Sequence, residues 1–377
     1  MICLEAEYLN LNRILLQSIA LWPFQQSKLV QIQFNISLTI LVGAIIYQIT
    51  VFLTSKFTPV IAIKTFSCVL FYTILVIHYS SFRFNINILK EMMTRLHCAC
   101  TKLRDKNEIA IIQKYGRGAV LIGKTNLWKL IYISVHPLFW TIQLLMPYCH
   151  IVIPTNGCRT HRLQTAVEYF IDQQKYYYVI LLHMNAAISI GILTFIATGT
   201  LMIAYLQHTC GMFRIACEFS ISKKIVYAVH IHREAMKLSE QLISRLDTTY
   251  FCLTVLVVIT MSLNLFQIFQ TITSEDNIME ATVPFINLLV LGLYVFFANF
   301  FGQNVTDHNN EVYAAAYNIR WYMCPIHEQK LILLLLQRKT REFHLTCGGL
   351  FIASFDCLAT LAKATMSYFT LMHSARR

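Results

Sequence analysis

Charge is scarce in this sequence, and its absence is concentrated in long stretches. Only 13% of the 377 residues are Asp, Glu, Lys or Arg, whereas 56% are hydrophobic. A soluble domain usually has about 25% charged residues and cannot bury so much apolar surface. Four stretches contain no charged residue at all: 34–54, 176–206, 250–273 and 283–303. The composition therefore excludes a soluble globular protein and indicates a membrane protein.

Motifs of hydrolytic enzymes are also missing. The sequence contains neither HExxH, which holds zinc, nor GxSxG, which presents a nucleophilic serine. His230 with His232, and Cys98 with Cys100, could suggest a metal site, but neither pair has further ligands at the usual spacing, so packing or surface roles are favoured. The paired broken helices of inverted-repeat transporters are not apparent. We expect no enzymatic activity, no cofactor and no metal.

Seven apolar stretches can each form a helix of roughly 20 residues, the length that crosses a bilayer core. The sequence thus predicts an all-α, polytopic membrane protein with seven transmembrane helices. Residues 1–33 contain charges and lack an apolar run followed by a small-residue cleavage site, so the first span is expected to be the insertion signal. The expected spans are 34–54, 59–81, 126–147, 176–206, 250–273, 283–303 and 347–372.

The distribution of Lys and Arg predicts the orientation. With the N-terminus in the cytoplasm, the inner segments hold 22 of the 31 basic residues and the outer segments hold 6. Because positively charged loops stay inside, we expect a cytoplasmic N-terminus and an extracellular C-terminus. The net charge of +12 is then a property of topology and not of nucleic-acid binding. Of the twelve cysteines, only Cys149 and Cys158 fall in an outer loop, which makes them the candidate disulfide pair.

The inner segment 304–346 contains an unusually apolar helix. Pro325 can open a helix, and residues 331–336 are six consecutive aliphatic side chains bounded by charges. A helix that is apolar on every side must be covered on every side. With so little cytoplasmic protein nearby, other copies of the chain are the favoured cover, and packing within one chain is the alternative. The candidate anchor residues are Leu331, Leu334 and Leu335.

The C-terminal third contains two informative stretches, EVYAAAYNIRWYMCPIHEQKLILLLLQRKT at 311–340 and CGGLFIASFDCLATLAKATMSYFTLMHS at 347–374. In these stretches the chain resembles the insect odorant receptors. LNRILLQSIALWPF at 11–24 is similar to the lead-in helix of that family, and HTCGMFRI at 208–215 to the start of its second cytoplasmic loop. The combination follows family order along the chain.

The resemblance implies a ligand-gated, poorly selective cation channel in the cell membrane of a sensory dendrite. Family members assemble as tetramers around a pore lined by the seventh span, and odorant-binding members usually assemble with a shared co-receptor. The short 207–249 segment indicates an odorant-binding member and not the co-receptor. The implied regions are 1–303, with spans 1 to 6 and the odorant pocket, 304–346, the cytoplasmic anchor, and 347–377, the pore helix and tail.

Two other seven-span classes are weaker alternatives. G-protein-coupled receptors carry Asp-Arg-Tyr and Asn-Pro-x-x-Tyr motifs that are missing here, and their orientation is opposite to the expected one. Gustatory receptors share the fold, but their usual C-terminal pattern has Gln-Phe where this chain continues as FTLMHS after Tyr368. That departure favours the odorant branch.

A small volatile ligand needs an apolar, aromatic cavity with few polar groups. The resemblance places it in the outer half of the membrane among spans 2, 3, 4 and 6, with a contribution from span 5. The candidate contacts are Phe66, Leu70, Thr73, His136, Phe139, Trp140, Gln143, Tyr177, Tyr178, Leu181, Met184, Phe285 and Leu289.

The family alignment also assigns pore positions in the last span. It places Leu371 at the narrowest apolar gate, Ala375 one turn outward and Ser367 one turn inward. A ring of apolar side chains blocks ions by excluding water. Asp356 and Lys363 lie two turns apart on the same span, and structural pairing is favoured over direct ion contact. The implied partners are the co-receptor or further copies of this chain, membrane lipid and a small volatile ligand.

Overall fold

A computed structural model describes most of the chain outside a long stretch between α7 and α10. The described residues are 10–54, 58–103, 105–124, 168–169, 172, 175–218, 225–273, 278–318, 321–338 and 343–375. Its main helices are α2 (Asn10–Ser18), α3 (Lys28–Ile49), α4 (Val51–Thr54), α5 (Pro59–Phe84), α6 (Ile86–Lys102), α7 (Lys106–Lys124), α10 (Tyr177–Cys217), α11 (Ile225–Thr273), α12 (Thr282–Asn318), α13 (Ile326–Arg338) and α14 (Phe355–Ala375). The all-α fold predicted from the sequence is confirmed.

Five helical segments of the described chain are long and apolar enough to cross a membrane. They are Lys28–Thr54, Pro59–Phe84, Tyr177–Cys217, Leu246–Thr273 and Thr282–Asn318. These correspond to the first, second, fourth, fifth and sixth predicted spans. The predicted third span, 126–147, lies outside the described residues. The seventh corresponds to α14, which is less apolar because it contains Asp356 and Lys363.

Side-chain caps set where two of the spans begin. The Ser27 hydroxyl accepts the backbone N–H of Val30 at the start of α3, and the Thr58 hydroxyl accepts that of Ile61 at the start of α5. Pro59 occupies the first turn of α5, where no helical N–H is needed. Each cap satisfies a donor that the bilayer would otherwise leave unpaired.

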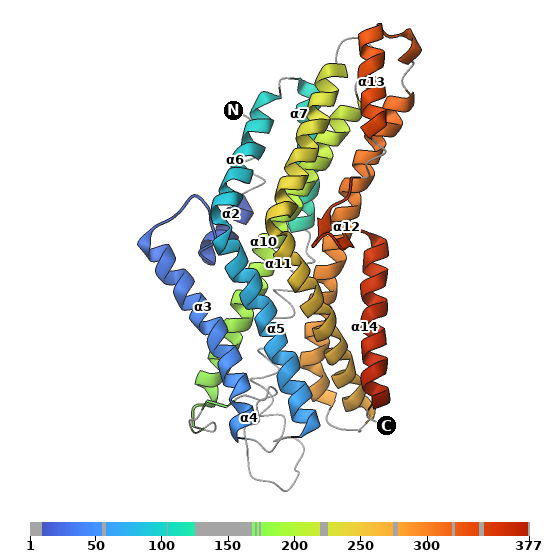
Figure 1. Ribbon diagram of the computed structural model, residues 1–377. Coiled ribbons are helices and arrows are strands. Elements are labelled where there is room, and N and C mark those ends of the chain that lie inside the picture. Colours follow the sequence, from blue (N-terminus) through green and yellow to red (C-terminus); the bar gives the residue numbers. More distant parts are fainter. Residues whose placement is uncertain are drawn as a thin grey trace.

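The fourth and fifth spans continue far beyond the membrane. Helix α10 has 41 residues and α11 has 49, so at 1.5 Å per residue they extend roughly 60 and 75 Å against a bilayer core of about 30 Å. Helix α6 continues α5 after a break at Asn85. In Figure 1 these helices form one elongated bundle, with α6, α7 and α13 at the upper end and α4 at the lower end.

The seventh span starts later than predicted. Residues 347–354 were expected to be helical, but Thr346–Cys347 (β1) and Phe351–Ile352 (β2) pair as a short antiparallel hairpin. Gly348 and Gly349 form its turn with φ of +63° and +65°, a conformation that favours glycine. Helix α14 begins after this hairpin, at Phe355.

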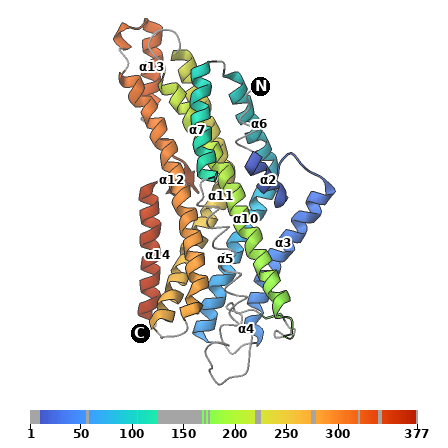
Figure 2. The same ribbon diagram turned by 180° about the vertical axis from the view of Figure 1, so that it is seen from behind.

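Two hydrophobic cores are stacked along the bundle. The lower core joins α3, α5, α10, α11 and α12 around side chains such as Phe71, Tyr79 and Leu291. The upper core joins α6, α10, α11 and α12 around Phe213 and Val305. Figure 2 shows α3 and α14 on opposite edges of the bundle, with α10, α11 and α12 between them. The central helices are thus covered by the chain itself, whereas α3 and α14 are open on one side.

Candidate functional site

An aromatic and polar cluster lies near the lower end of the bundle. The rings of Tyr47 and Tyr169 stack with centroids 4.0 Å apart, and the Tyr169 hydroxyl lies 2.7 Å from His183 Nδ1. The Thr50 hydroxyl donates to the Glu168 carbonyl oxygen at 2.7 Å, and Glu168 N–H donates to the Tyr47 carbonyl at 2.8 Å. These contacts fix residues 168–169 against α3 and α10.

Buried polar side chains lie inside the bundle. Ser67 donates to Asn264 Oδ1 at 3.0 Å, and His78 Nε2 lies 2.8 Å from the Thr198 hydroxyl. The His78 ring is packed against the rings of Phe195 and Tyr294, with centroids 4.7 and 5.8 Å away. Such groups combine apolar contact with a few hydrogen-bonding positions, which is the character of a small-molecule site.

Among the described residues, several buried polar atoms have no hydrogen-bond partner. They include the side-chain amide of Gln48 on α3, which is fully buried, and the hydroxyl of Thr65 on α5, which is 1% exposed. Buried polar groups are nearly always paired with protein or water. The outer half of the bundle therefore has unused hydrogen-bonding capacity beside its apolar core.

Some of the candidate ligand residues point into the bundle, and others lie on its exposed surface. Helix α10 buries three of them, with Tyr177, Leu181 and Met184 at most 4% exposed, whereas Tyr178 is 54% exposed. On α5, Leu70 and Thr73 are half-buried and Phe66 is 50% exposed. On α12, Phe285 and Leu289 are also exposed. The candidates His136, Phe139, Trp140 and Gln143 lie outside the described residues.

The candidate residues of α5 are not its most buried ones. The candidates were residues 66, 70 and 73, whereas the buried positions in this stretch are Thr65, Ser67, Phe71, Tyr72, Ile74 and Leu75. Because this span is apolar on all sides, its sequence did not indicate which face turns inward. The aromatic pair Phe71 and Tyr72 is the interior feature that the sequence reasoning missed.

Helix α14 is seated on α11 and α12 by a few specific contacts. Ser354 caps it, with its hydroxyl accepting Cys357 N–H at 3.2 Å, and Ser354 N–H donates to Asn299 Oδ1 on α12 at 3.1 Å. Further along, the Ser262 hydroxyl on α11 donates to the Thr365 carbonyl at 3.1 Å. Leu361 and Thr365 are its buried residues. The rest of α14 is bound on one side only.

The candidate pore residues lie on the uncovered side of α14. Ser367, Leu371 and Ala375 are all exposed, and Leu371 is 64% exposed. Their spacing of four residues places them in one row along the helix. Asp356 and Lys363 are exposed on the same helix, and among the described residues no ion pair joins them directly.

The candidate anchor residues are only partly covered by their own chain. Leu331 packs against a small cluster formed by Ile225, Cys324 and Ile332, and Leu335 against the upper core. Leu333 and Leu334 remain 67% and 61% exposed. The preceding residues Trp321, Tyr322, Met323 and Ile326 are exposed as well. Helix α13 therefore presents a large apolar surface on a single chain.

A phosphate-loop spacing in the sequence does not form a phosphate site. GAVLIGKT at 118–125 matches GxxxxGK[ST], a pattern that cradles phosphate when it forms a loop between a strand and a helix. Here residues 118–124 continue helix α7. Their backbone N–H groups belong to the helix and are not arranged around an anion.

The nine cysteines among the described residues are free thiols, and the candidate pair Cys149 and Cys158 lies outside the described part.

Comparisons with known proteins agree with this architecture. The sequence profile of a family described as 7tm Odorant receptor matches residues 58–366. The structure of the insect olfactory receptor OR5 from Machilis hrabei in complex with eugenol is similar, with a TM-score of 0.78 and 13% identity over 98% of both chains. A second structure of that receptor gives a TM-score of 0.77 and 15% identity over 97% of both chains. No curated protein matches the sequence significantly.

Proposed function

This chain belongs to the insect odorant receptor family, and from that membership we propose that it is a subunit of an odorant-gated cation channel. It is a multi-pass membrane protein and a receptor, not an enzyme. The observation that carries the channel proposal is the seating of α14. This helix is fixed to α11 and α12 along one side, and its other side carries Ser367, Leu371 and Ala375 uncovered.

Four copies of α14 around a central axis would give the uncovered side a function. Ser367 would contact water in the inner part of the path, and four Leu371 side chains would form an apolar constriction that excludes ions. Small outward movements of α14 would widen this ring and allow water and cations through. An anchor in membrane lipid would need neither the exposed serine nor the charged residues of this helix.

Helix α13 supports the assembly. Its exposed Leu333 and Leu334 continue the apolar surface of residues 321–326. Exposed apolar surface of this extent marks an interface. We propose that neighbouring subunits, either the co-receptor or copies of this chain, cover this apolar surface. Leu331, Leu334 and Leu335 are the proposed anchor residues.

We assign the ligand site to the outer half of the bundle. Tyr177, Leu181 and Met184 supply buried apolar contacts from α10, and the inward side of α5 adds Tyr72. The remaining candidates, including those of the third span, stay part of this proposal. The ligand is a small, mostly apolar volatile, because the buried side chains assigned to the site are apolar or aromatic.

The orientation follows the charge distribution. The bundle end that carries α6, α7 and α13 also carries the segments rich in Lys and Arg, which stay in the cytoplasm. The C-terminus of α14 lies at the opposite end, outside the cell. In this orientation a ligand from outside reaches α10 and α5 first.

Patch-clamp recording tests the proposal. The full chain is expressed with and without an insect odorant co-receptor, and membrane current is recorded while a panel of volatiles is applied. The expected result is a ligand-evoked, poorly selective cation current. Ligand-driven substrate uptake without current, or a current abolished by inhibitors of G-protein signalling, would overturn it.

A further inference from the structure

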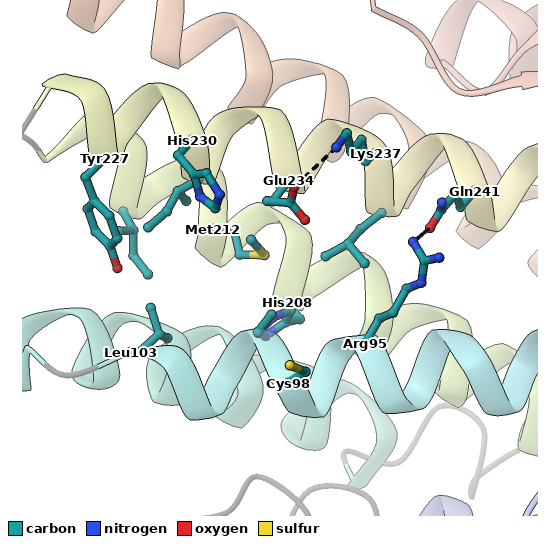
Figure 3. A pocket seen from close by; sticks show the side chains of 14 residues that line it. Arg95, Cys98, Leu103, His208, Met212, Tyr227, His230, Glu234, Lys237 and Gln241 are labelled. Atoms are coloured by element: carbon teal, nitrogen blue, oxygen red, sulfur yellow. Dashed lines mark hydrogen bonds and ion pairs between the residues drawn. The ribbon is translucent and has the colours of Figure 1, made fainter.

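A cavity of about 230 Å³ lies between α6, α10 and α11, in the upper half of the bundle and apart from the proposed odorant site (Figure 3). Arg95 lines it eleven residues beyond the end of α5, roughly 16 Å past that helix end at 1.5 Å per residue. The cavity is therefore outside the hydrocarbon core.

The floor of the cavity is apolar and buried. Helix α10 contributes Met212 and Ile215, which are 6% and 1% exposed, and α11 contributes Ile231 and Leu238, both 5% exposed. In Figure 3, α6 forms the facing wall with Cys98 and Leu103 directed toward α11. A molecule inside would exchange water for side-chain contacts on several sides.

The charged residues at the rim compensate one another. Arg95 donates to Glu91 at 2.6 Å and to Gln241 at 2.7 Å, the latter across the gap between α6 and α11. Lys237 lies 3.4 Å from Glu234. The cavity is lined by two cations and one carboxylate, but Arg95 is paired with Glu91 beside the cavity and Lys237 with Glu234, so neither cation is left to pair with an anionic ligand. The arrangement favours an uncharged ligand.

One buried polar side chain can orient such a ligand. His208 lines the cavity, is 2% exposed, and has the Cys100 sulfur 3.9 Å from both ring nitrogens. A thiol carries one hydrogen and can donate to only one nitrogen, and sulfur is a weak partner. A hydroxyl or carbonyl group of a ligand would make a stronger hydrogen bond with the imidazole.

The volume limits the size of the ligand. Sites for drug-sized molecules occupy about 300 to 1,000 Å³, and a cavity of about 150 Å³ holds benzene. A cavity of about 230 Å³ is therefore suited to a molecule of roughly ten non-hydrogen atoms. We propose that it is a second binding site, for a small uncharged molecule with an apolar body and one hydroxyl or carbonyl group, and that occupancy biases gating.

Two helices that line the cavity also extend to the proposed odorant site and to the contact with α14. Helix α10 runs without interruption from Tyr177 to the cavity residues His208 and Met212, and α11 runs from the cavity to Ser262, which contacts α14. A molecule that wedges α6 from α11 therefore acts on a helix that holds the pore helix. The gating part of this inference rests on the proposed channel function, whereas the binding part does not.

Alkylation of Cys98 tests binding directly, because this exposed thiol lines the cavity. The full chain in membranes is treated with N-ethylmaleimide, with and without 2-phenylethanol as the probe, and modification is quantified by peptide mass spectrometry. Ala110→Cys provides a reference thiol on the exposed surface of α7. At four times the dissociation constant, the probe should slow modification at Cys98 about fivefold and leave position 110 unchanged.

Cavity-filling variants supply the control. Ala99→Leu adds volume to the cavity wall and should abolish protection, whereas Ala110→Leu, on an exposed surface, should retain it. Leu103→Trp provides a second filling variant if the first reaches the membrane poorly. Unprotected Cys98 in the wild type, or equal protection of Cys98 in Ala99→Leu and Ala110→Leu, would overturn the site. Protection without any change in odorant-evoked current would overturn only the gating effect.

Discussion

The hydroxyl of Ser262 on α11 donates to the backbone carbonyl of Thr365 on α14 at 3.1 Å. The bond joins the long central helix to the proposed pore helix near its middle. The same hydroxyl also lies 2.8 Å from the Val258 carbonyl within α11, so it can rotate between an internal and an external acceptor. Movement of α14 therefore does not leave a buried donor without a partner.

We expect Ser262→Ala to make the channel open more readily. The hydrogen bond to Thr365 contributes about 1 kcal/mol, which is about fivefold in a closed–open equilibrium if opening breaks it. The measurement is the odorant concentration for half-maximal current, which should fall by up to about fivefold. Ser239→Ala is the matched control, because Ser239 is buried on the same helix and donates only to Ala235 within it. Equal shifts in both variants would exclude a role for the Ser262 contact.

Leu371→Ala should raise ligand-independent current. Shortening four exposed apolar side chains at the constriction lowers the cost of wetting the pore. Met366→Ala serves as control, since Met366 is also exposed but lies about 140° away around α14 at 100° per residue. Basal current and relative permeability to cations of different size report the effect. If the two variants behave alike, Leu371 is not the gate.

Gly348→Ala should damage the hairpin that precedes α14. A Cβ at this position would lie 2.5 Å from the Phe251 ring, and φ of +63° disfavours any L side chain. Gly349 has φ of +65° but open space around its Cβ position, so Gly349→Ala bears only the conformational cost of about 1 kcal/mol. Thermal unfolding of the purified receptor should separate the two variants. Equal losses would mean that the contact with Phe251 is unimportant.

Sequence reasoning predicted the spans better than their faces. Long apolar runs located α3, α5, α10, α11 and α12, because crossing a bilayer demands continuous apolar length. The inward face of α5 was not predictable, since lipid and core both favour apolar side chains and no periodicity separates them. The hairpin before α14 depends on the contact of Gly348 with Phe251, far away in the sequence. The exposed row on α14 becomes visible only in the folded chain.

Acidification should weaken the cytoplasmic half of the bundle through His232. This histidine is buried on α11, beyond the membrane-spanning part, and its Nε2 lies 2.9 Å from Asn309 Oδ1 on α12. Burial lowers the pKa of His232 below its usual value, and the nearby Arg338 adds to that effect, against the hydrogen bond with Asn309. Below a pH of about 6.5 the unfolded chain binds a proton that the folded chain resists, so stability is lost as pH falls.

The measurement for His232 is the unfolding temperature at pH 7.5 and at pH 5.5. On acidification, the unfolding temperature of the wild type should fall further than that of His232→Gln, whose side chain does not titrate and can still donate to Asn309. His230→Gln is the control, since His230 is exposed two residues away on the same helix. A fall of equal size in the wild type and in His232→Gln would assign the pH effect to other groups.

Leu181→Ala and Leu182→Ala test the ligand site with neighbouring residues of one type. Leu181 is 2% exposed inside the bundle, whereas Leu182 is 59% exposed on its outside. Truncating Leu181 enlarges the interior and removes apolar contacts, which costs about 2 to 5 kcal/mol of folding stability at a buried leucine. For ligands that fit the original space, the concentration for half-maximal current should rise about tenfold or more. For bulkier ligands it should rise less or fall, because the new space accepts them. Leu182→Ala should leave the ranking of ligands by half-maximal concentration unchanged.

Current amplitudes are normalised to surface expression, because a folding defect lowers the current evoked by every ligand by the same factor. A change in ligand order in Leu182→Ala, or none in Leu181→Ala, would place the site elsewhere in the bundle.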